Sequence, residues 1–175
     1  MRDRQPEAFQ EIIEDFRAIF PEVIGLSFKH LGESKYGLEF SRRIGKKTWK
    51  FIGPEISDGF AITLAICTLI HNPYSPRIIL IEEIENGLNP STLRAILENI
   101  IISSERKEIQ FLVTTHSPIL LELLSSNPEY VIVCEQEAGK SKYTPLQDIL
   151  LKFGPDYKHG ESLFHLWFDG LIGGL

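Results

Sequence analysis

The sequence predicts an α/β fold in which a mainly parallel sheet with flanking helices follows a small antiparallel β meander. Three observations support this prediction. Early segments on either side of a turn at 32–33 alternate apolar and polar residues, as antiparallel strands do. Short continuous apolar runs follow at 77–81, 109–113 and 130–134, as expected for strands buried on both faces. Helical segments separate these runs, so parallel crossovers are expected.

Length and composition indicate a single cytoplasmic domain spanning residues 1–175. Hydrophobic residues make up 43% of the chain and charged residues 24%, which is ordinary for a globular protein with a proper core. The net charge of −6 argues against a general nucleic-acid-binding protein, so such a contact would be local. The polar N-terminus is no signal peptide, and the longest apolar run, 61–70, is too short to span a membrane. Cys67 and Cys134 lie in apolar runs and are predicted to be reduced core residues.

Residues 1–55 are predicted to form a helix and the meander. Apolar residues recur with helical spacing from Phe9 to Phe20, and Pro21 ends this helix. Alternation predicts the meander strands at 24–28, 36–40 and 48–52.

Residues 56–175 are predicted to form the parallel sheet and its helices. An apolar helix begins at Ser57 and ends near His71. Two further helices begin at proline, which suits the first turn because its N–H would have no partner there. These starts are Asn89-Pro90 and Ser117-Pro118.

Acidic residues end one predicted strand abruptly, in the segment "IILIEEIENGLNP". Glu82 and Glu83 stand side by side although carboxylates are costly to desolvate and repel one another, so a cation is expected near them. Thr114-Thr115-His116 ends the next strand. The carboxyl ends of parallel strands line the crevice of an open sheet, so these groups are expected to converge.

Four motifs, in this order, resemble the C-terminal half of an ABC-type ATPase head of the SMC/RecF/OLD-like group, often labelled AAA-family ATPases. They are "ISDGF" (56–60, signature), "RIILIEE" (77–83, Walker B and catalytic glutamate), "ENGLNP" (85–90, D-loop) and "VTTHSP" (113–118, switch-histidine loop). The closing "ESLFHLWFDGLIGGL" also resembles the tail of this group. The D-loop departs from the family pattern at Ile84, usually proline, and at Asn89, usually histidine or aspartate. The resemblance implies a P-loop NTPase fold of the ABC type.

The resemblance also implies roles for individual residues. Glu82 would belong to the Mg²⁺ shell, where aspartate is more usual, and Glu83 would orient or deprotonate the attacking water. His116 would reach the γ-phosphate of ATP. The helix begun at 57–59 would contact the γ-phosphate held by an opposite subunit, since its free N–H groups and dipole attract anions. The signature and D-loop residues expected at ATP are Ser57, Asp58, Gly59, Asn86, Gly87 and Asn89. Taken singly, these residues also fit helix caps, a solvated strand end and a capping histidine.

The phosphate-binding P-loop, G-x-x-x-x-G-K-[ST], is missing from these 175 residues. "CEQEAGKS" (134–141) has the closing triplet but Cys134 replaces the first glycine, so a hairpin between 131–134 and 142–144 is predicted instead. The chain is therefore expected to need a Walker A-bearing N-terminal lobe or subunit, as a C-terminal piece, a split subunit or a degenerate scaffold. ATP, Mg²⁺, an ATP-dependent dimer and a DNA or effector partner in DNA repair or phage defence are expected only in the completed assembly.

Two other classes of function remain open. A catalytically inactive interaction module would not depend on Glu83. A metal-dependent nuclease would use Glu82, Glu83, Glu85 and His116, although the D-x-D strand end of Toprim-type nucleases is missing. Separately, residues 41–50, "SRRIGKKTWK", combine five basic residues with a tryptophan and could contact nucleic acid locally; a solvated hairpin is the simpler interpretation.

Overall fold

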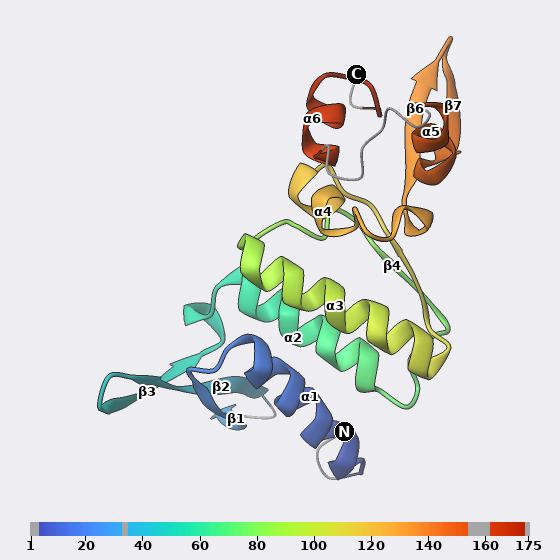
Figure 1. The fold of residues 1–175 in the computed structure, drawn as a ribbon. Helices are drawn as coiled ribbons and strands as arrows, with labels where there is room; N and C mark the ends of the chain where they lie inside the picture. Colours follow the sequence, from blue (N-terminus) through green and yellow to red (C-terminus); the bar gives the residue numbers. More distant parts are fainter. Residues whose placement is uncertain (1–3, 33–34, 154–161, 174–175) are drawn as a thin grey trace. The chain divides into compact units, whose positions relative to one another are not determined.

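The computed structural model describes residues 4–32, 35–153 and 162–173, which belong to two compact units (Figure 1). The first unit extends to Thr114 and the second begins at Thr115. The position of one unit relative to the other is not determined, so each unit is described by itself. None of the helices within the described residues is long and apolar enough to cross a membrane.

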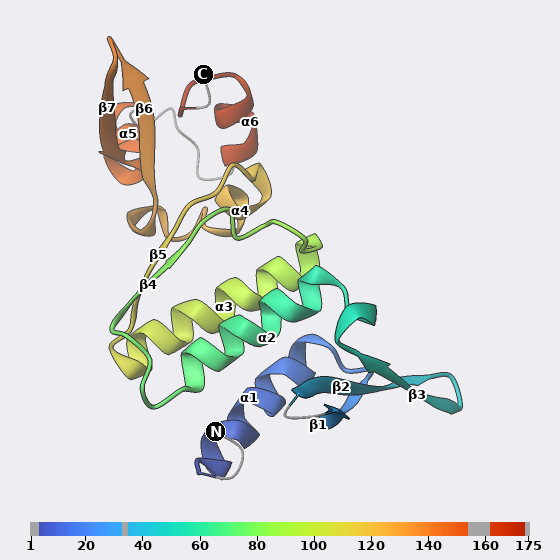
Figure 2. The ribbon, with the colours of Figure 1, turned by 180° about the vertical axis from the view of Figure 1, so that it is seen from behind.

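The first unit combines three longer helices with a three-stranded antiparallel sheet and a parallel strand pair. The antiparallel sheet, in the order β1-β2-β3, is the predicted meander. The helices α1, α2 and α3 contact one another (Figure 2). The elements are α1 (Pro6–Ile19), β1 (Val23–Gly32), β2 (Lys35–Ile44), β3 (Lys47–Ile52), the 3-10 turn η1 (Gly53–Glu55), α2 (Asp58–His71), β4 (Ile78–Ile81), α3 (Pro90–Lys107) and β5 (Gln110–Val113).

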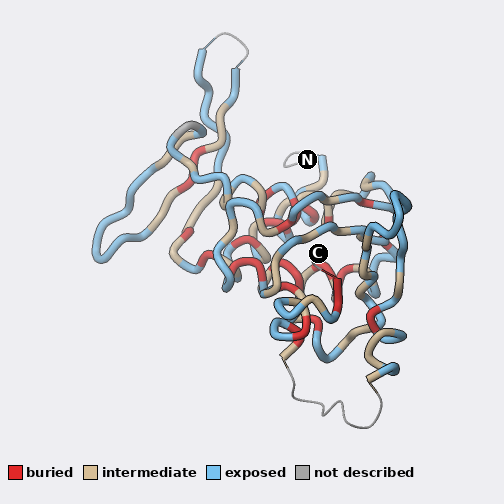
Figure 3. Tube along the Cα trace, turned by 90° about the horizontal axis from the view of Figure 1, so that it is seen from above, coloured by how far each residue is buried: buried red, intermediate tan, exposed pale blue. Residues whose placement is uncertain are grey.

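The core of the first unit is built around aromatic side chains from α1, β2 and α2. The ring of Phe16 lies 5.5 Å from that of Phe40 and 5.6 Å from that of Phe60, and Phe20 stacks on Phe60 at 4.0 Å. Such pairs add to the burial of apolar area that drives folding. Residues on both sides of position 55 therefore share one core, which holds the meander against the helices. In Figure 3 the helices of this unit contain buried segments, and the outer part of the β1–β2 hairpin, next to its grey tip, is exposed.

The predicted mainly parallel sheet is found only as the pair β4–β5, within the part of the chain that the structure describes. Its strands are not buried on both faces, contrary to the prediction. Ile79 is 5% exposed, whereas Leu80 is 71% and Leu112 54% exposed. A parallel sheet is covered on both faces when helices pack on both sides. Here one face of the pair is open, so its apolar residues alternate between inside and outside.

The second unit contains a β hairpin and three short helices. The prediction that 130–134 forms a further parallel strand is wrong, because β6 pairs antiparallel with β7. The predicted hairpin is confirmed, with a tight turn at Ala138 (φ 50°) and Gly139 (φ 77°). A small core of Leu146, Leu163, Leu166 and Ile172 holds the unit together. Its elements are α4 (Pro118–Leu123), the 3-10 turn η2 (Pro128–Tyr130), β6 (Ile132–Glu137), β7 (Lys140–Pro145), α5 (Leu146–Lys152) and α6 (Leu163–Phe168).

The two cysteines have different environments. Cys67 is buried in the first unit, as predicted, and burial raises the pKa of its thiol to about 12. Cys134 is exposed, so its predicted core position is wrong. The reason is that β6 belongs to a two-stranded hairpin with alternating exposure, whereas a strand inside a covered sheet would hide both faces.

Candidate functional site

The carboxyl ends of β4 and β5 meet at one rim of the first unit. The parallel register pairs Ile81 with Val113, and the pairing continues one step further. The Thr114 N–H donates to the Ile81 carbonyl at 2.9 Å, and the Ile84 N–H donates to the Thr114 carbonyl at 3.3 Å. The two strands are therefore neighbours, which is the condition for their ends to converge. Glu82, Glu83 and Thr114 come together because the strands end in register.

Glu83 is held by three hydrogen bonds in a backbone conformation that only a minority of non-glycine residues adopt. Its φ of 47° lies in the left-handed region, which costs roughly 1–3 kcal/mol in a non-glycine residue. The Glu83 N–H donates to Thr114 Oγ1 at 3.1 Å. Asn86 donates twice, from its backbone N–H to the Glu83 carbonyl at 2.9 Å and from Nδ2 to Glu83 Oε2 at 2.6 Å. The carboxylate is exposed but fixed in direction, as a group that orients water needs to be.

Glu82 is the neighbouring carboxylate, and it has a different environment. It is exposed, and no hydrogen bond or ion pair of its side chain is found within the described residues. Magnesium in nucleotide sites is bound by one or two carboxylates together with phosphate oxygens and waters, so a single free carboxylate fits this ion. The described residues bring together no group of three or more His, Cys, Asp or Glu side chains that could hold a metal alone. The nuclease hypothesis, which would also use Glu85 and His116, stays a hypothesis.

The start of α2 packs directly against the turn that follows Glu83. A Cβ added to Gly59 would lie 2.5 Å from the Gly87 carbonyl oxygen, closer than real Cβ contacts. Gly87 has a φ of 73°, and a Cβ there would lie 3.4 Å from that of Asp58. Residues predicted to belong to the signature and to the D-loop are thus neighbours in space. Close packing inside the unit already requires glycine at Gly59, independently of any approach to phosphate.

The two helix starts at this rim are capped differently. Ser57 precedes α2 but its side chain makes no capping hydrogen bond, so the first N–H groups of α2 keep their capacity to bind an anion. Asn89 precedes α3, and its Oδ1 accepts from the Thr92 N–H at 3.0 Å and from Ser91 Oγ at 2.7 Å. Asn89 therefore acts as an N-cap in this structure, and its predicted contact with ATP stays a prediction.

His116 lies at the start of the second unit, three residues after β5. It is exposed, and the neighbouring Thr115 Oγ1 accepts a hydrogen bond from the Ser117 N–H at 2.9 Å, just before α4 begins. The predicted helix start at Pro118 is confirmed. His116 belongs to the second unit and Glu83 to the first, so the switch-histidine role of His116 stays a prediction. The role of Thr114 as an anchor of Glu83 was not predicted from the sequence. The only signal for this role was the position of Thr114 directly after a predicted strand.

The solved structures similar to this chain include the following two. One, from "Structural biochemistry of ATP-driven dimerization and DNA stimulated activation of SMC ATPases", is 19% identical with a TM-score of 0.53, and the match covers 87% of this chain and 97% of that one. The other, "Crystal structure of the SmcHead bound to the C-winged helix domain of ScpA", is 22% identical with a TM-score of 0.51, and the match covers 78% of this chain and 42% of that one. At these identities the likeness concerns the fold, which is similar to that of SMC ATPase heads. None of the curated proteins compared with the chain matches it.

The family to which the chain belongs is shown by a match over more than half of its length. A family model described as "AAA domain, putative AbiEii toxin, Type IV TA system" matches residues 24–122. The chain belongs to this family of AAA-type ATPase domains. The matched range includes residues 56–60, 77–83, 85–90 and 113–118, where the sequence predicts the four motifs.

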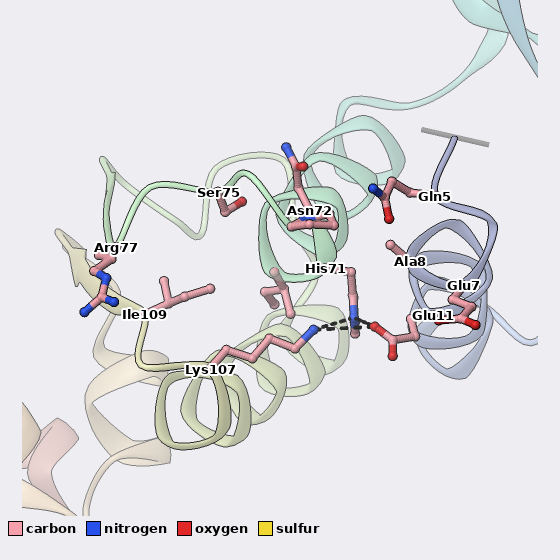
Figure 4. A pocket seen from close by; sticks show the side chains of 12 residues that line it. Gln5, Glu7, Ala8, Glu11, His71, Asn72, Ser75, Arg77, Lys107 and Ile109 are labelled. Carbon is pink, nitrogen blue, oxygen red and sulfur yellow. Dashed lines mark hydrogen bonds and ion pairs between the residues drawn. The ribbon is translucent and has the colours of Figure 1, made fainter. Parts of the chain in front are cut away.

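A separate polar pocket of about 440 Å³ lies between α1, α2 and α3 in the first unit (Figure 4). His71 Nδ1 lies 2.7 Å from Glu11 Oε2, and its Nε2 lies 2.6 Å from Asp15 Oδ2. Lys107 Nζ lies 3.0 Å from His71 Nδ1 and 3.5 Å from Glu11 Oε2. The hydrogen bond with His71 is the largest cause that holds the pKa of Glu11 below its ordinary 4.5. These contacts tie the three helices together.

Glu11→Gln is expected to lower the free energy of unfolding at neutral pH by about 0.5–1 kcal/mol, because half-exposed ion pairs are screened by solvent. The pKa of Glu11 is depressed in the folded state, so its stabilisation is present above 4.5 and is lost as pH falls through the folded value. Urea unfolding at several pH values between about 3 and 7 measures the difference. Glu14→Gln, on the same helix but bonded to Gln10, is the control. A difference from wild type that grows as the pH falls would contradict the assignment.

Proposed function

We propose that this chain supplies the signature, Walker B, D-loop and switch histidine of a composite ATP-hydrolysis site of the ABC type. The observation that carries the proposal is the Glu83 carboxylate, held by Asn86 and Thr114 at the carboxyl ends of two parallel strands. Phosphate-transfer sites work mainly by positioning and electrostatics, and a fixed exposed carboxylate next to a helix N-terminus suits both.

Each residue would have a distinct task in that site. Glu83 would accept a hydrogen bond or proton from the attacking water, and Asn86 would keep its carboxylate in place. Glu82 would bind Mg²⁺, which supplies charge neutralisation on the phosphates when bound. The N–H groups at Asp58 and Gly59, with the Ser57 hydroxyl, would contact the γ-phosphate held by an opposite subunit. The remaining contacts, His116 to the γ-phosphate and Gly87 and Asn89 across the dimer interface, come from the family resemblance.

The open face of β4–β5 supports completion by another lobe. Ile78, Leu80 and Leu112 expose apolar side chains on a two-stranded pair, and a parallel pair is normally part of a larger covered sheet. No P-loop pattern occurs in these 175 residues, and Gly139-Lys140-Ser141 lies in a hairpin. The proposed site therefore takes its phosphate loop from a lobe elsewhere on a longer polypeptide or on a partner. ATP-dependent dimerisation and coupling to DNA or an effector belong to the same proposal, by likeness to the SMC structures.

Assembly of the composite site can be tested with a substitution on the open face of β4–β5. The chain alone is expected to show no ATPase activity, and activity is expected on mixing with the P-loop-bearing lobe from the same gene or operon. Leu80→Lys should leave the isolated chain folded, since the side chain is 71% exposed. It should reduce ATPase activity on mixing by about tenfold or more, because the new interface would bury an unpaired charge.

Leu151→Lys is the matched control, because Leu151 is also 71% exposed and lies on α5 of the second unit. If ATPase activity falls equally in both variants, the open face of β4–β5 is not part of the interface with the P-loop-bearing lobe. Absence of activity in every mixture, with no nucleotide-dependent association, would instead favour an inactive interaction module.

A further inference from the structure

The hairpin formed by β2 and β3 concentrates positive charge on an acidic protein. Its segment 41–50 contains five of the 18 basic residues and no acidic residue, which leaves 13 basic against 24 acidic residues in the rest of the chain. Such a local charge can attract a polyanion that the whole surface would repel. The question is which of the five charges are available to a ligand.

Two of the five basic residues are used inside the first unit. Arg42 Nη2 donates to Glu22 Oε1 at 2.7 Å, and its guanidinium lies 4.9 Å from the centre of the Phe60 ring. Lys50 Nζ donates to Glu39 Oε1 at 2.8 Å. The contacts of Arg42 attach the hairpin to the core, and the pair Lys50–Glu39 joins β3 to β2 at the base of the hairpin.

The other three basic residues, Arg43, Lys46 and Lys47, lie around the turn. All three are exposed, and none has an ion pair within the residues that the structure describes. The register pairs Arg43 with Thr48 across the hairpin, and Gly45 forms the turn with a φ of 60°. Three free cations are thus gathered within one turn of backbone, at the end of the hairpin that lies away from the helices (Figure 1).

An exposed tryptophan stands beside these cations. Trp49 is 52% exposed and pairs directly with Arg42 across the strands. Side chains of paired residues and of alternate residues share a face of a sheet, so Ile44, Lys47 and Trp49 lie on the same face. Arg43, which pairs with Thr48, lies on the opposite face, so Lys46 in the turn and Lys47 are the free cations on the side of the tryptophan. Ile44 is 53% exposed as well. A flat aromatic ring bordered by free cations is the combination that single-stranded nucleic acids bind, with stacking for a base and charge for its phosphates.

We propose that the β2–β3 hairpin binds single-stranded nucleic acid, with Lys46 and Lys47 at the phosphates and Trp49 stacked on a base. This inference does not depend on the proposed ATPase role, because the isolated chain carries the whole surface. Two phosphate contacts predict that log K falls with log salt concentration with a slope of about −1.4 for a single strand.

The first test is fluorescence anisotropy of a labelled oligothymidylate of about 20 nucleotides, titrated with the full chain at several salt concentrations. Lys46→Glu/Lys47→Glu is expected to weaken binding about tenfold or more and to remove most of the salt dependence, since both phosphate contacts are lost. Lys140→Glu/Lys152→Glu changes the net charge equally at exposed positions in the second unit, and should leave most of the affinity. Circular dichroism of each variant checks its folding.

The second test separates stacking from charge. Trp49→Leu is expected to weaken binding about five- to 150-fold without changing the salt slope. Tyr36→Leu, at another exposed aromatic residue of the same sheet, should have little effect. No saturable binding at about 50 mM salt, or equal losses in the two double charge reversals, would overturn the proposal. Tighter binding of poly-glutamate than of oligothymidylate would also overturn it and assign the hairpin to an acidic protein partner.

Discussion

Glu83→Gln is expected to lower the ATP-hydrolysis rate of the completed assembly by about 10²–10⁴-fold, the usual contribution of a positioned general base. Glutamine has the same shape, and its oxygen can still accept the 2.6 Å hydrogen bond from Asn86 Nδ2. It cannot accept a proton from water at neutral pH. The change therefore removes the chemical capacity of the side chain and keeps its position, so kcat should fall while the fold persists.

The control for this prediction is Glu98→Gln, an exposed glutamate on α3. Urea unfolding of each chain alone should show differences within about 0.5 kcal/mol, as expected for exposed substitutions. An unchanged hydrolysis rate in Glu83→Gln would exclude the proposed role of this carboxylate. Loss of activity together with loss of folding would show only that the turn is needed for stability, and Asn86→Ala, which frees the carboxylate, would then separate position from charge.

Gly59→Ala is expected to lower the free energy of unfolding of the first unit by about 1–3 kcal/mol, the cost of overpacking a close contact. The added methyl group would lie 2.5 Å from the Gly87 carbonyl oxygen, and a backbone atom cannot turn away as a flexible side chain can. Either the start of α2 or the turn at 86–88 must move. Since both carry proposed ATP contacts, hydrolysis in the completed assembly should fall as well.

Gly53→Ala provides the matched control, because nothing lies within 4 Å of a Cβ at that glycine. It should be neutral or slightly stabilising, since alanine restricts the unfolded chain. Chemical unfolding followed by circular dichroism measures both variants. Equal stability of Gly59→Ala and wild type would mean that the close contact with Gly87 relaxes without cost, and would leave approach to phosphate as the reason for glycine at this position.

Part of the candidate site could be predicted from the sequence, because its residues come directly after the ends of two predicted strands. Glu82 and Glu83 end one apolar run and Thr114 the next, and parallel strands in register bring such ends together. The roles of Thr114 and Asn86 as anchors of Glu83 were not predictable, since they depend on a left-handed residue inside the turn. The position of Asn89 before Pro90 indicated its capping role. The D-loop resemblance instead led to the prediction that Asn89 contacts ATP.

Burial was the least predictable property, because a residue's exposure depends on what packs against it. The apolar runs at 77–81 and 130–134 look alike in sequence, yet β4 joins a parallel pair and β6 an antiparallel hairpin. Cys67 and Cys134 both stand in apolar surroundings along the chain, and only Cys67 is buried. Neighbouring layers decide these outcomes, and they come from residues distant in sequence.

By itself, the sequence determined the type and order of most elements and the family motifs, because periodicity, proline and glycine act locally on the backbone. Tertiary structure alone decided that β4–β5 has an open face, that α2 meets the D-loop turn through Gly59 and Gly87, and that Glu83 is held in a strained turn. These are contacts between segments far apart along the chain, and their energies depend on three-dimensional packing that no local pattern encodes.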